Sequence, residues 1–177
     1  MLMLCRFNSF GLNVFYVKGM YGVEINVQFW TVCMVQKGDY VLLLDRQHDD
    51  FKGFIPPGGK VEFPESLTEA AIREVKEETG LEVSHLQYKG IYEYVNPAKN
   101  DRYMIFNYLT KNYSGTLLED SREGKPVWIH KDEAVNLPMQ PSIKRRFPLY
   151  FEDGTFEIHV VWDEEKNQEG SVSIKKT

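Results

Sequence analysis

The chain has 177 residues, the length of one ordinary domain, and its 42% hydrophobic content is enough to form a core, which excludes disorder as a description of the whole chain. The 21 lysines and arginines against 26 aspartates and glutamates give a net charge of −5, which disfavours wholesale binding to nucleic acid. Two cysteines, Cys5 and Cys33, are too few for a disulfide framework or a cysteine-rich zinc site, so we expect a protein of the reducing cytoplasm.

The N-terminus is apolar over residues 1–16, but it has the features of neither a signal peptide nor a membrane span. Arg6 and Asn8 interrupt the apolar run that a signal peptide needs, and the run is shorter than the ~20 residues of a spanning helix. Met20 stands directly before the first strand pattern. We therefore expect residues 1–20 to be a loosely attached extension, or the product of an upstream start codon, and we expect no association with a membrane.

A β-hairpin and a rigid loop are the first predicted elements. β-Branched and aromatic residues over 23–35, turn residues at 37–39 and an apolar run over 40–44 indicate the hairpin. The sequence Pro-Pro-Gly-Gly at 56–59 can continue neither a helix nor a central strand, so it predicts a rigid loop.

A helix is predicted over residues 66–79. Ser66 and Glu69 have the spacing of a capping box, and Gly80 stands where a glycine commonly ends a helix. One stripe of the helix should pack on a sheet, because its less polar residues recur at helical spacing. This stripe consists of Ile72, Val75 and Thr79.

Further strands and a second helical segment predict an α/β fold in which helices cover a mixed sheet. The domain is expected to span residues 21–163. Residues 164–177 are polar and contain few large apolar side chains, so we expect a frayed C-terminal tail. The remaining predicted elements are strands at 86–95, 103–110, 126–130 and 156–162 and a helical stretch at 143–151.

Three glutamates in the predicted helix stand at positions i, i+3 and i+4, which places the carboxylates of Glu74, Glu77 and Glu78 on one face within one turn. Such a cluster is either a solvated acidic face or a site for a hard cation, Mg²⁺ or Mn²⁺, held by carboxylate oxygens and water. Gly58 and Gly59 favour the second interpretation, because a polyphosphate can approach a backbone that carries no side chains.

The same segment resembles the signature motif of the Nudix hydrolase superfamily. Gly59, Glu65 and the run from Arg73 to Leu81 match every fixed position of that motif at the correct spacing. The resemblance implies an α/β/α sandwich with a mixed β-sheet between helices. It also implies a Mg²⁺-dependent pyrophosphohydrolase, Mn²⁺ being the other metal that the carboxylates would accept.

Roles for individual residues follow from this resemblance. Glu74, Glu77 and Glu78 match the metal ligands, together with a carbonyl group of Gly58 or Gly59. Arg73 is counted with the catalytic set and is also expected to pair with Glu65, which fixes the helix against its loop; Glu65 and Gly80 are expected to be structural. The general base stays open, with Glu74 as first choice. Glu123, five residues before Trp128, is either a further metal ligand or an ordinary exposed loop residue.

The substrate is less well defined. The whole chain is similar to MutT-type enzymes, which hydrolyse oxidised purine nucleoside triphosphates such as 8-oxo-dGTP to the monophosphate and pyrophosphate. The animal enzymes that hydrolyse oxidised purine nucleotides bind the base with an Asn, a Trp and a pair of Asp residues. This sequence departs from that pattern at Ile55, Gln140, Ser142 and Ile143, so recognition of 8-oxoguanine stays open. The expected substrate contacts are Phe54, Gly58, Gly59, Lys60 and Gln140.

Two other functions remain as alternatives. Pro97, sixteen residues past Leu81, is typical of hydrolases of ADP-ribose and other nucleoside-diphosphate sugars, although Asn96-Pro97 is also ordinary turn sequence. A non-catalytic nucleotide-binding regulator is the other alternative, and the intact glutamates argue against it. The basic cluster at 144–146 is interpreted as a solvated face or a phosphate contact. We expect a small-molecule nucleotide as partner, no nucleic acid, and a monomer or homodimer.

Overall fold

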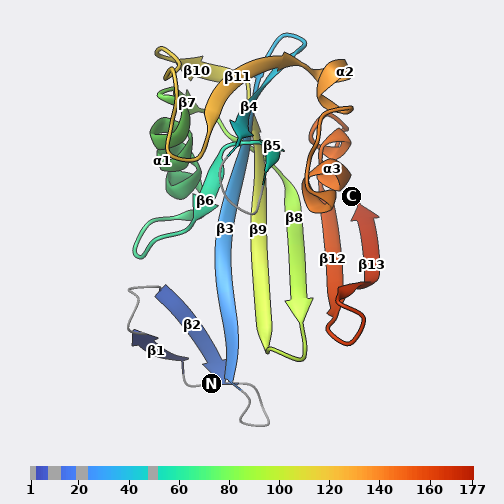
Figure 1. Ribbon diagram of the computed structural model, residues 1–177. Coiled ribbons are helices and arrows are strands. Elements are labelled where there is room, and N and C mark those ends of the chain that lie inside the picture. The colour runs from blue at the N-terminus through green and yellow to red at the C-terminus, as the bar shows by residue number, and fades with distance from the viewer. Residues whose placement is uncertain (1–2, 8–12, 19–23, 48–51) are drawn as a thin grey trace.

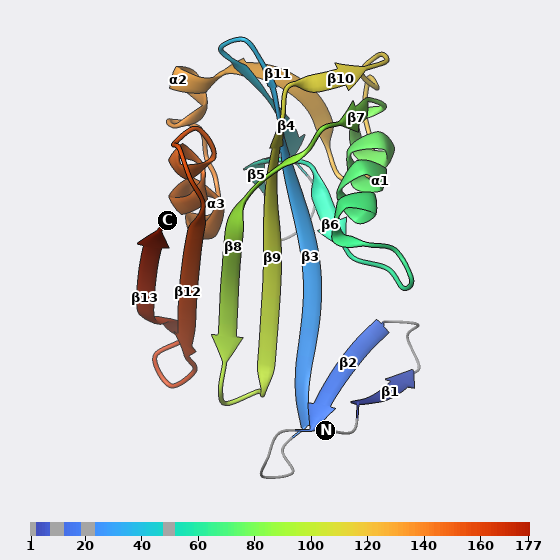
Figure 2. The ribbon, with the colours of Figure 1, turned by 180° about the vertical axis from the view of Figure 1, so that it is seen from behind.

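The structure is a computed structural model that describes residues 3–7, 13–18, 24–47 and 52–177. One large mixed sheet runs the length of the molecule, with α1 on one face and α2 and α3 on the other (Figures 1 and 2). The helices are α1 (Leu67–Thr79), α2 (Lys131–Ala134), α3 (Pro141–Arg146) and the 3₁₀ helix η1 (Pro148–Tyr150). The strands are β1 (Met3–Phe7), β2 (Asn13–Lys18), β3 (Glu24–Lys37), β4 (Tyr40–Arg46), β5 (Gly53–Ile55), β6 (Gly58–Lys60), β7 (Glu82–Ser84), β8 (Gln87–Asn96), β9 (Asp101–Thr110), β10 (Asn112–Ser114), β11 (Lys125–His130), β12 (Phe156–Asp163) and β13 (Gln168–Lys176).

The sheet has eleven strands, and its main path runs in the order β1-β2-β3-β9-β8-β12-β13. β3 and β9 are parallel, as are β8 and β12, whereas the other neighbours on this path are antiparallel. Off this path, β4 and β6 pair with β3, and β5 and β11 pair with β4. The mixed sheet between helices confirms the α/β/α prediction.

β3 joins the two halves of the core, because successive side chains of a strand point to opposite faces. Cys33 and Val35 pack against Val75 of α1, whereas Met34 packs in a second cluster with Ala134 of α2 and Phe147 after α3. Both clusters are almost fully buried. The three glutamates of the motif are thus carried by a helix that is anchored on one face of the sheet.

The predicted helix and its caps are confirmed. Ser66 accepts a hydrogen bond from the Glu69 backbone, and the Glu69 side chain accepts one from the Ser66 backbone, which completes the capping box. Gly80 ends α1 with φ of +79°, a left-handed conformation that glycine adopts without strain. Val75 and Thr79 are buried, and Ile72 packs against the same cluster, as the predicted stripe requires.

The structure corrects the expectation of a frayed C-terminal tail. Residues 168–176 form β13, which pairs antiparallel with β12 at the edge of the sheet. Val172 lies opposite Val160 and Ile174 opposite Ile158, so the few apolar residues of this segment form cross-strand pairs on one face. The polar average composition concealed this alternation.

Three smaller expectations are also corrected. The N-terminal extension is joined to the sheet rather than loosely attached, because β2 pairs with β3 and β1 pairs with β2; residues 1–2, 8–12 and 19–23 lie outside the described residues. Gly58 and Gly59 belong to strand β6, which pairs with β3. The helical stretch over 143–151 is divided between α3 and η1.

Arg146 differs most from its expected place in a solvated basic cluster. The residue is 4% exposed, and its guanidinium donates to Asn107 Oδ1 at 2.9 Å and to the Ser142 carbonyl at 3.1 Å. It also lies over the ring of Tyr92.

No helix in the described part of the chain is long and apolar enough to cross a membrane.

Candidate active site

A cavity of about 1020 Å³ lies beside α1. Carboxylates line one wall, and the backbone of β6 forms the adjoining surface. Lysine and arginine side chains also reach the cavity, so the site combines both charges. The lining residues are Trp30, Arg46, Ile55, Gly58, Gly59, Lys60, Glu62, Glu74, Glu77, Glu78, Ser121, Arg122, Glu123 and Gln140.

Glu78 is the most buried carboxylate of this wall, with 5% of the residue exposed. Its Oε2 accepts a hydrogen bond from the Gly58 backbone N–H at 2.8 Å. Burial is the main cause that raises the pKa of Glu78 to about 8; the negative charges of Glu74 and Glu123 also raise it, whereas the Gly58 hydrogen bond and the Arg46 charge oppose the shift. The ionised form of Glu78 is therefore disfavoured chiefly because the carboxyl group is removed from water.

Glu74 lies against the glycine strand. Burial raises the pKa of this carboxyl, whereas the hydrogen bond from Arg73 Nη1, 2.8 Å from Glu74 Oε1, lowers it. A Cβ atom placed on Gly59 would lie 2.3 Å from Glu74 Oε1, which is far inside van der Waals contact. Glycine at position 59 therefore creates the space that the Glu74 carboxylate occupies.

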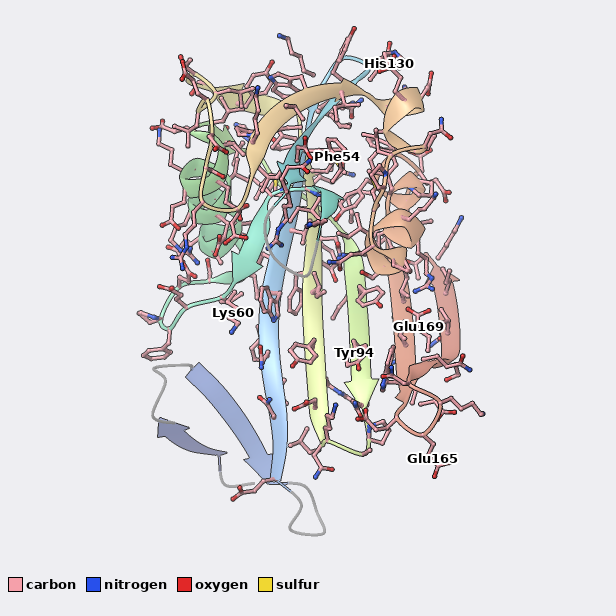
Figure 3. The ribbon with its side chains drawn as sticks, viewed as in Figure 1. Phe54, Lys60, Tyr94, His130, Glu165 and Glu169 are labelled. Carbon is pink, nitrogen blue, oxygen red and sulfur yellow. The ribbon has the colours of Figure 1, made fainter. Side chains whose placement is uncertain are left out.

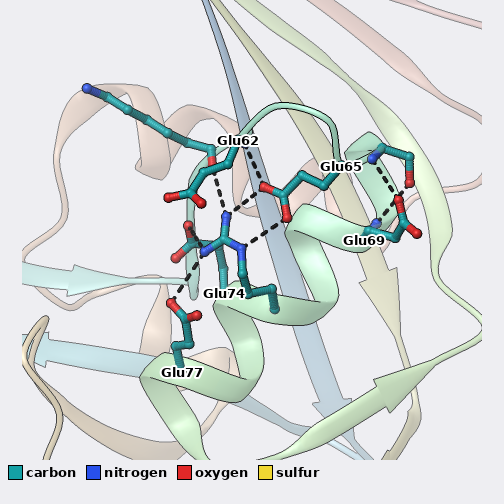
Figure 4. Close-up of polar contacts among 8 residues, drawn as sticks. Glu62, Glu65, Glu69, Glu74 and Glu77 are labelled. Carbon is teal, nitrogen blue, oxygen red and sulfur yellow. Dashed lines mark hydrogen bonds and ion pairs between the residues drawn. The ribbon is translucent and has the colours of Figure 1, made fainter. Parts of the chain in front are cut away.

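Arg73 donates hydrogen bonds to three carboxylates that are labelled in Figure 4, those of Glu65, Glu74 and Glu77. Its Nε and Nη2 donate to the two oxygens of Glu65 at 3.0 and 2.8 Å, and Nη2 also donates to the Lys60 carbonyl at 3.0 Å. Nη1 reaches Glu77 at 3.3 Å, in addition to Glu74. The pairing of Glu65 with Arg73 is as expected from the sequence, and it ties α1 to the loop and to β6.

The residues fit a hard divalent cation by their chemistry. Glu74, Glu77 and Glu78 supply oxygen donors to one cavity wall, and burial, with a smaller contribution from neighbouring carboxylates, raises the pKa values of Glu74 and Glu78. As their side chains lie in the structure, no group of three or more acidic, His or Cys residues in the described part of the chain could hold a metal ion. The Glu74 and Glu77 carboxylates instead pair with Arg73, whose guanidinium supplies the positive charge here.

Glu123 reaches the same cavity from the loop before β11. Its Oε2 lies 3.2 Å from Arg46 Nη2, and its charge contributes to the raised pKa of Glu78. Glu123 therefore lies at the acidic wall, although it is more than forty positions beyond the end of α1 in the sequence. Its role as a metal ligand stays a prediction.

Lys60 and Gln140 also lie on the cavity wall, as expected for substrate contacts. The Lys60 ammonium group lies 5.3 Å from the ring centroid of Trp30. Lys60 is labelled in Figure 3, on β6 beside β3. Phe54 does not line this cavity: its side chain packs against the cluster that contains Met34. β5 pairs with β4, and the Phe54 backbone N–H donates to the Pro138 carbonyl at 2.8 Å, which fixes this orientation.

Sequence reasoning missed Trp30, Arg46 and Arg122 at the cavity. Trp30 comes from β3 and lies opposite Lys60 of β6, so only the strand pairing identifies it. Its buried Nε1 has no hydrogen-bond partner within the described ranges. The positive charges of Arg46 and Arg122 beside the acidic motif would have been the signal for these two residues.

Pro97 lies in the turn between β8 and β9, at the opposite end of the sheet from α2 (Figure 1). Asn96 Oδ1 accepts a hydrogen bond from the Ala98 N–H at 3.1 Å, which is ordinary turn geometry. Pro97 is not among the residues that line the cavity. Its position therefore fits the interpretation as a turn residue.

Comparison with known proteins finds a family model and a solved structure that match this architecture. A family model described as the NUDIX domain matches residues 27–150. A solved structure of the mutator MutT protein from Bacillus halodurans has a TM-score of 0.74 and 31% sequence identity, and the alignment covers 84% of this chain and 97% of that one.

Three curated relatives match shorter stretches. The uncharacterized Nudix hydrolase YvcI of Bacillus subtilis is 34% identical over 63% of this chain and 72% of its own length. The putative 8-oxo-dGTP diphosphatase YtkD of Bacillus subtilis is 44% identical over 40% of this chain, and the ADP-ribose pyrophosphatase of Methanocaldococcus jannaschii is 43% identical over 39%. The chain spans only 41% and 40% of these last two proteins, which differ in the substrates that their names give.

Proposed function

The chain belongs to the NUDIX domain family, and from this premise we propose that its cavity hydrolyses a phosphoric anhydride bond of a nucleoside triphosphate with the help of Mg²⁺ or Mn²⁺. A modified purine nucleotide such as 8-oxo-dGTP is the proposed substrate, and the monophosphate and pyrophosphate are the products. The observation that carries the proposal is the carboxylate wall of Glu74, Glu77 and Glu78, facing a cavity that also contains Lys60 and Arg122.

The metal ion, when held by these three carboxylates and a carbonyl group of Gly58 or Gly59, would neutralise charge that develops on the phosphoryl oxygens. Lys60 and Arg122 provide positive charge for the anionic phosphate chain. The glycine backbone lets that chain come close to β6.

Glu74 is the proposed general base. Its carboxylate is partly buried, and Arg73 fixes its orientation through the 2.8 Å hydrogen bond. Glu74 would take a proton from the attacking water as the new oxygen–phosphorus bond forms and the anhydride oxygen–phosphorus bond breaks. Pyrophosphate then leaves with the electron pair of the broken bond.

Gln140 is the proposed contact for the base or sugar. It is the N-cap residue of α3 and reaches the cavity from the face of the sheet opposite α1. Ile55 adds an apolar surface, so this pocket contains fewer polar groups than one built on Asn and Asp side chains. We therefore propose weak discrimination between oxidised and ordinary purines.

The test is a hydrolysis panel with Mg²⁺ in which the products are resolved. The panel contains 8-oxo-dGTP, the four ordinary deoxynucleoside triphosphates, ADP-ribose and NADH. The proposal predicts that pyrophosphate is released from purine triphosphates. Preferred cleavage of ADP-ribose would overturn the substrate class, and a folded protein that hydrolyses none of these compounds would favour the regulator instead.

A further inference from the structure

The C-terminal hairpin, formed by β12 and β13, lies beyond residues 27–150 that match the family model. β12 pairs with β8, and β13 forms the edge of the sheet next to α3 (Figures 2 and 3). The hairpin thus lies outside the segment that the family model matches, and it contacts the face carrying α3.

α3 brings Gln140 to the cavity but has little stability of its own. The helix has six residues, and its N-cap Gln140 makes no capping hydrogen bond through its side chain. Helices of this length do not persist in isolation, so contacts with the rest of the molecule must set the position of α3. Gln140 can be placed accurately only if these contacts hold the helix.

Two successive arginines make those contacts. Arg146 donates to Asn107 of β9 inside the core. Arg145 forms a two-pronged ion pair with Glu169 of the C-terminal hairpin, in which Nη2 lies 2.6 Å from Oε2 and Nη1 lies 3.2 Å from Oε1. The side chains of Arg145 and Glu169 are 21% and 29% exposed, so the pair is partly shielded from solvent. A two-pronged arginine–carboxylate pair fixes direction as well as distance.

We propose that Glu169 is a positioning residue for the substrate cavity. Through Arg145 it fixes the orientation of α3, and α3 in turn presents Gln140 to the nucleotide. The inference rests on the proposed function, because it takes Gln140 as a substrate contact. Glu169 does not line the cavity and does not touch the α1 carboxylates, so its loss should act on substrate binding rather than on the chemical step.

The principal variant is Glu169→Gln, and the matched control is Glu157→Gln. Glu157 also makes an ion pair from the hairpin, with Lys175 at 3.0 Å, but that pair joins β12 to β13 and does not involve α3. For Glu169→Gln we expect KM for 8-oxo-dGTP to rise about fivefold while kcat changes less than about twofold. Glu157→Gln should leave both constants unchanged.

Hydrogen–deuterium exchange of the full chain provides a readout that needs no substrate. Glu169→Gln should speed amide exchange in the peptide that covers 140–147, with no change in the α1 peptide that covers 67–79. A double variant in which the two charges are exchanged, Arg145→Glu with Glu169→Arg, should regain most of the exchange protection over 140–147 that Glu169→Gln loses. Unchanged exchange over 140–147 in Glu169→Gln would overturn the inference.

A double-mutant cycle tests the route through Gln140. If Glu169 acts through this residue, Glu169→Gln should raise KM in the wild-type background but have no further effect in Gln140→Ala. Additive effects would overturn the inference. A Gln140→Ala variant with unchanged KM would instead refute the proposed substrate contact, and the exchange result would then still decide whether Glu169 positions α3.

Discussion

α1 and α3 lie on opposite faces of one sheet, and different contacts hold them there. On the α1 face, Arg73 pairs with several carboxylates at the edge of an open cavity. On the α3 face, Arg146 is buried, and it donates to neutral acceptors on Asn107 and Ser142. The first arrangement has an excess of negative charge, whereas the second is a compact network in which Tyr150 also donates to Asn107.

This difference separates the proposed cation site on α1 from the hydrogen-bonded network that holds α3 on the sheet. Burial and mutual repulsion raise the pKa values of Glu74 and Glu78, so the α1 wall would be more stable with a bound cation. The Asn107 side chain, by contrast, uses both its oxygen and its nitrogen in hydrogen bonds. Local conflicts of this kind are expected where a protein functions, and satisfied networks are expected where it only needs to be stable.

The largest effect is expected for Glu78→Gln. The amide oxygen can still accept the Gly58 N–H, but the negative charge needed by a cation is lost, so kcat should fall about 10³-fold while the melting temperature is kept or raised. Steady-state kinetics and thermal unfolding measure both. Glu82→Gln, at an exposed ion pair with Lys76, is the control. Turnover like the wild type in Glu78→Gln would contradict a catalytic acidic wall.

The two neighbouring glycines should respond differently to alanine. A Cβ at Gly58 would lie 2.2 Å from the Thr31 carbonyl oxygen, and backbone cannot yield easily, so Gly58→Ala should lower the free energy of unfolding by about 3 kcal/mol. In Gly59→Ala the Glu74 carboxylate can move aside, so kcat should fall about tenfold with little loss of stability. Denaturant unfolding and kinetics distinguish these results; equal destabilisation by both substitutions would contradict the assignment.

Asn107→Leu should disrupt the α3 face. The substitution removes the acceptor of both Arg146 and Tyr150, and the free energy of unfolding should fall by about 2 kcal/mol. Asn112→Leu, at an exposed strand position, is the matched control. Urea unfolding followed by tryptophan fluorescence measures the difference. The account of Arg146 as a structural residue fails if the two variants unfold at the same urea concentration.

The smallest effect is a change in acid sensitivity. The hydrogen bond from Arg73 lowers the pKa of Glu65 below its ordinary value of 4.5. The contribution of the Glu65–Arg73 pair to the free energy of unfolding is therefore complete above the pKa of Glu65 in the unfolded chain, and it is lost as the pH falls through the lower pKa of the folded state. Stability measured from pH 6 to pH 3 should decline less steeply in Glu65→Gln than in the wild type. Parallel curves would show that this pair does not contribute to acid unfolding.

The α1 region could be predicted from the sequence because its determinants are local. The capping residues Ser66 and Glu69, the ending glycine Gly80 and the three glutamates all lie within one short segment. The pair of Arg73 with Glu65 spans only eight positions. The capping contacts follow from helical spacing, whereas the pair of Glu65 with Arg73 was implied by the resemblance to the Nudix motif, because Glu65 lies before the first residue of α1.

The contacts that hold α3 could not be predicted because they join distant segments, whereas β13 was missed because the polar average composition of residues 164–177 concealed its alternating apolar residues. Arg145 and Glu169 are 24 positions apart, and Arg146 and Asn107 are 39 apart. No local sequence pattern predicts either of these pairs. Trp30 was missed at the cavity for the same reason, since the pairing of β3 with β6 brings it there.

The most direct test of the acidic wall on α1 is a Mn²⁺ titration of the full chain followed by electron paramagnetic resonance, in the wild type, Glu78→Gln and the control Glu82→Gln. We predict that the wild type and the control bind Mn²⁺ equally, and that Glu78→Gln weakens binding by about tenfold or more. Equal affinity in all three proteins would contradict the assignment of the α1 carboxylates as a cation site.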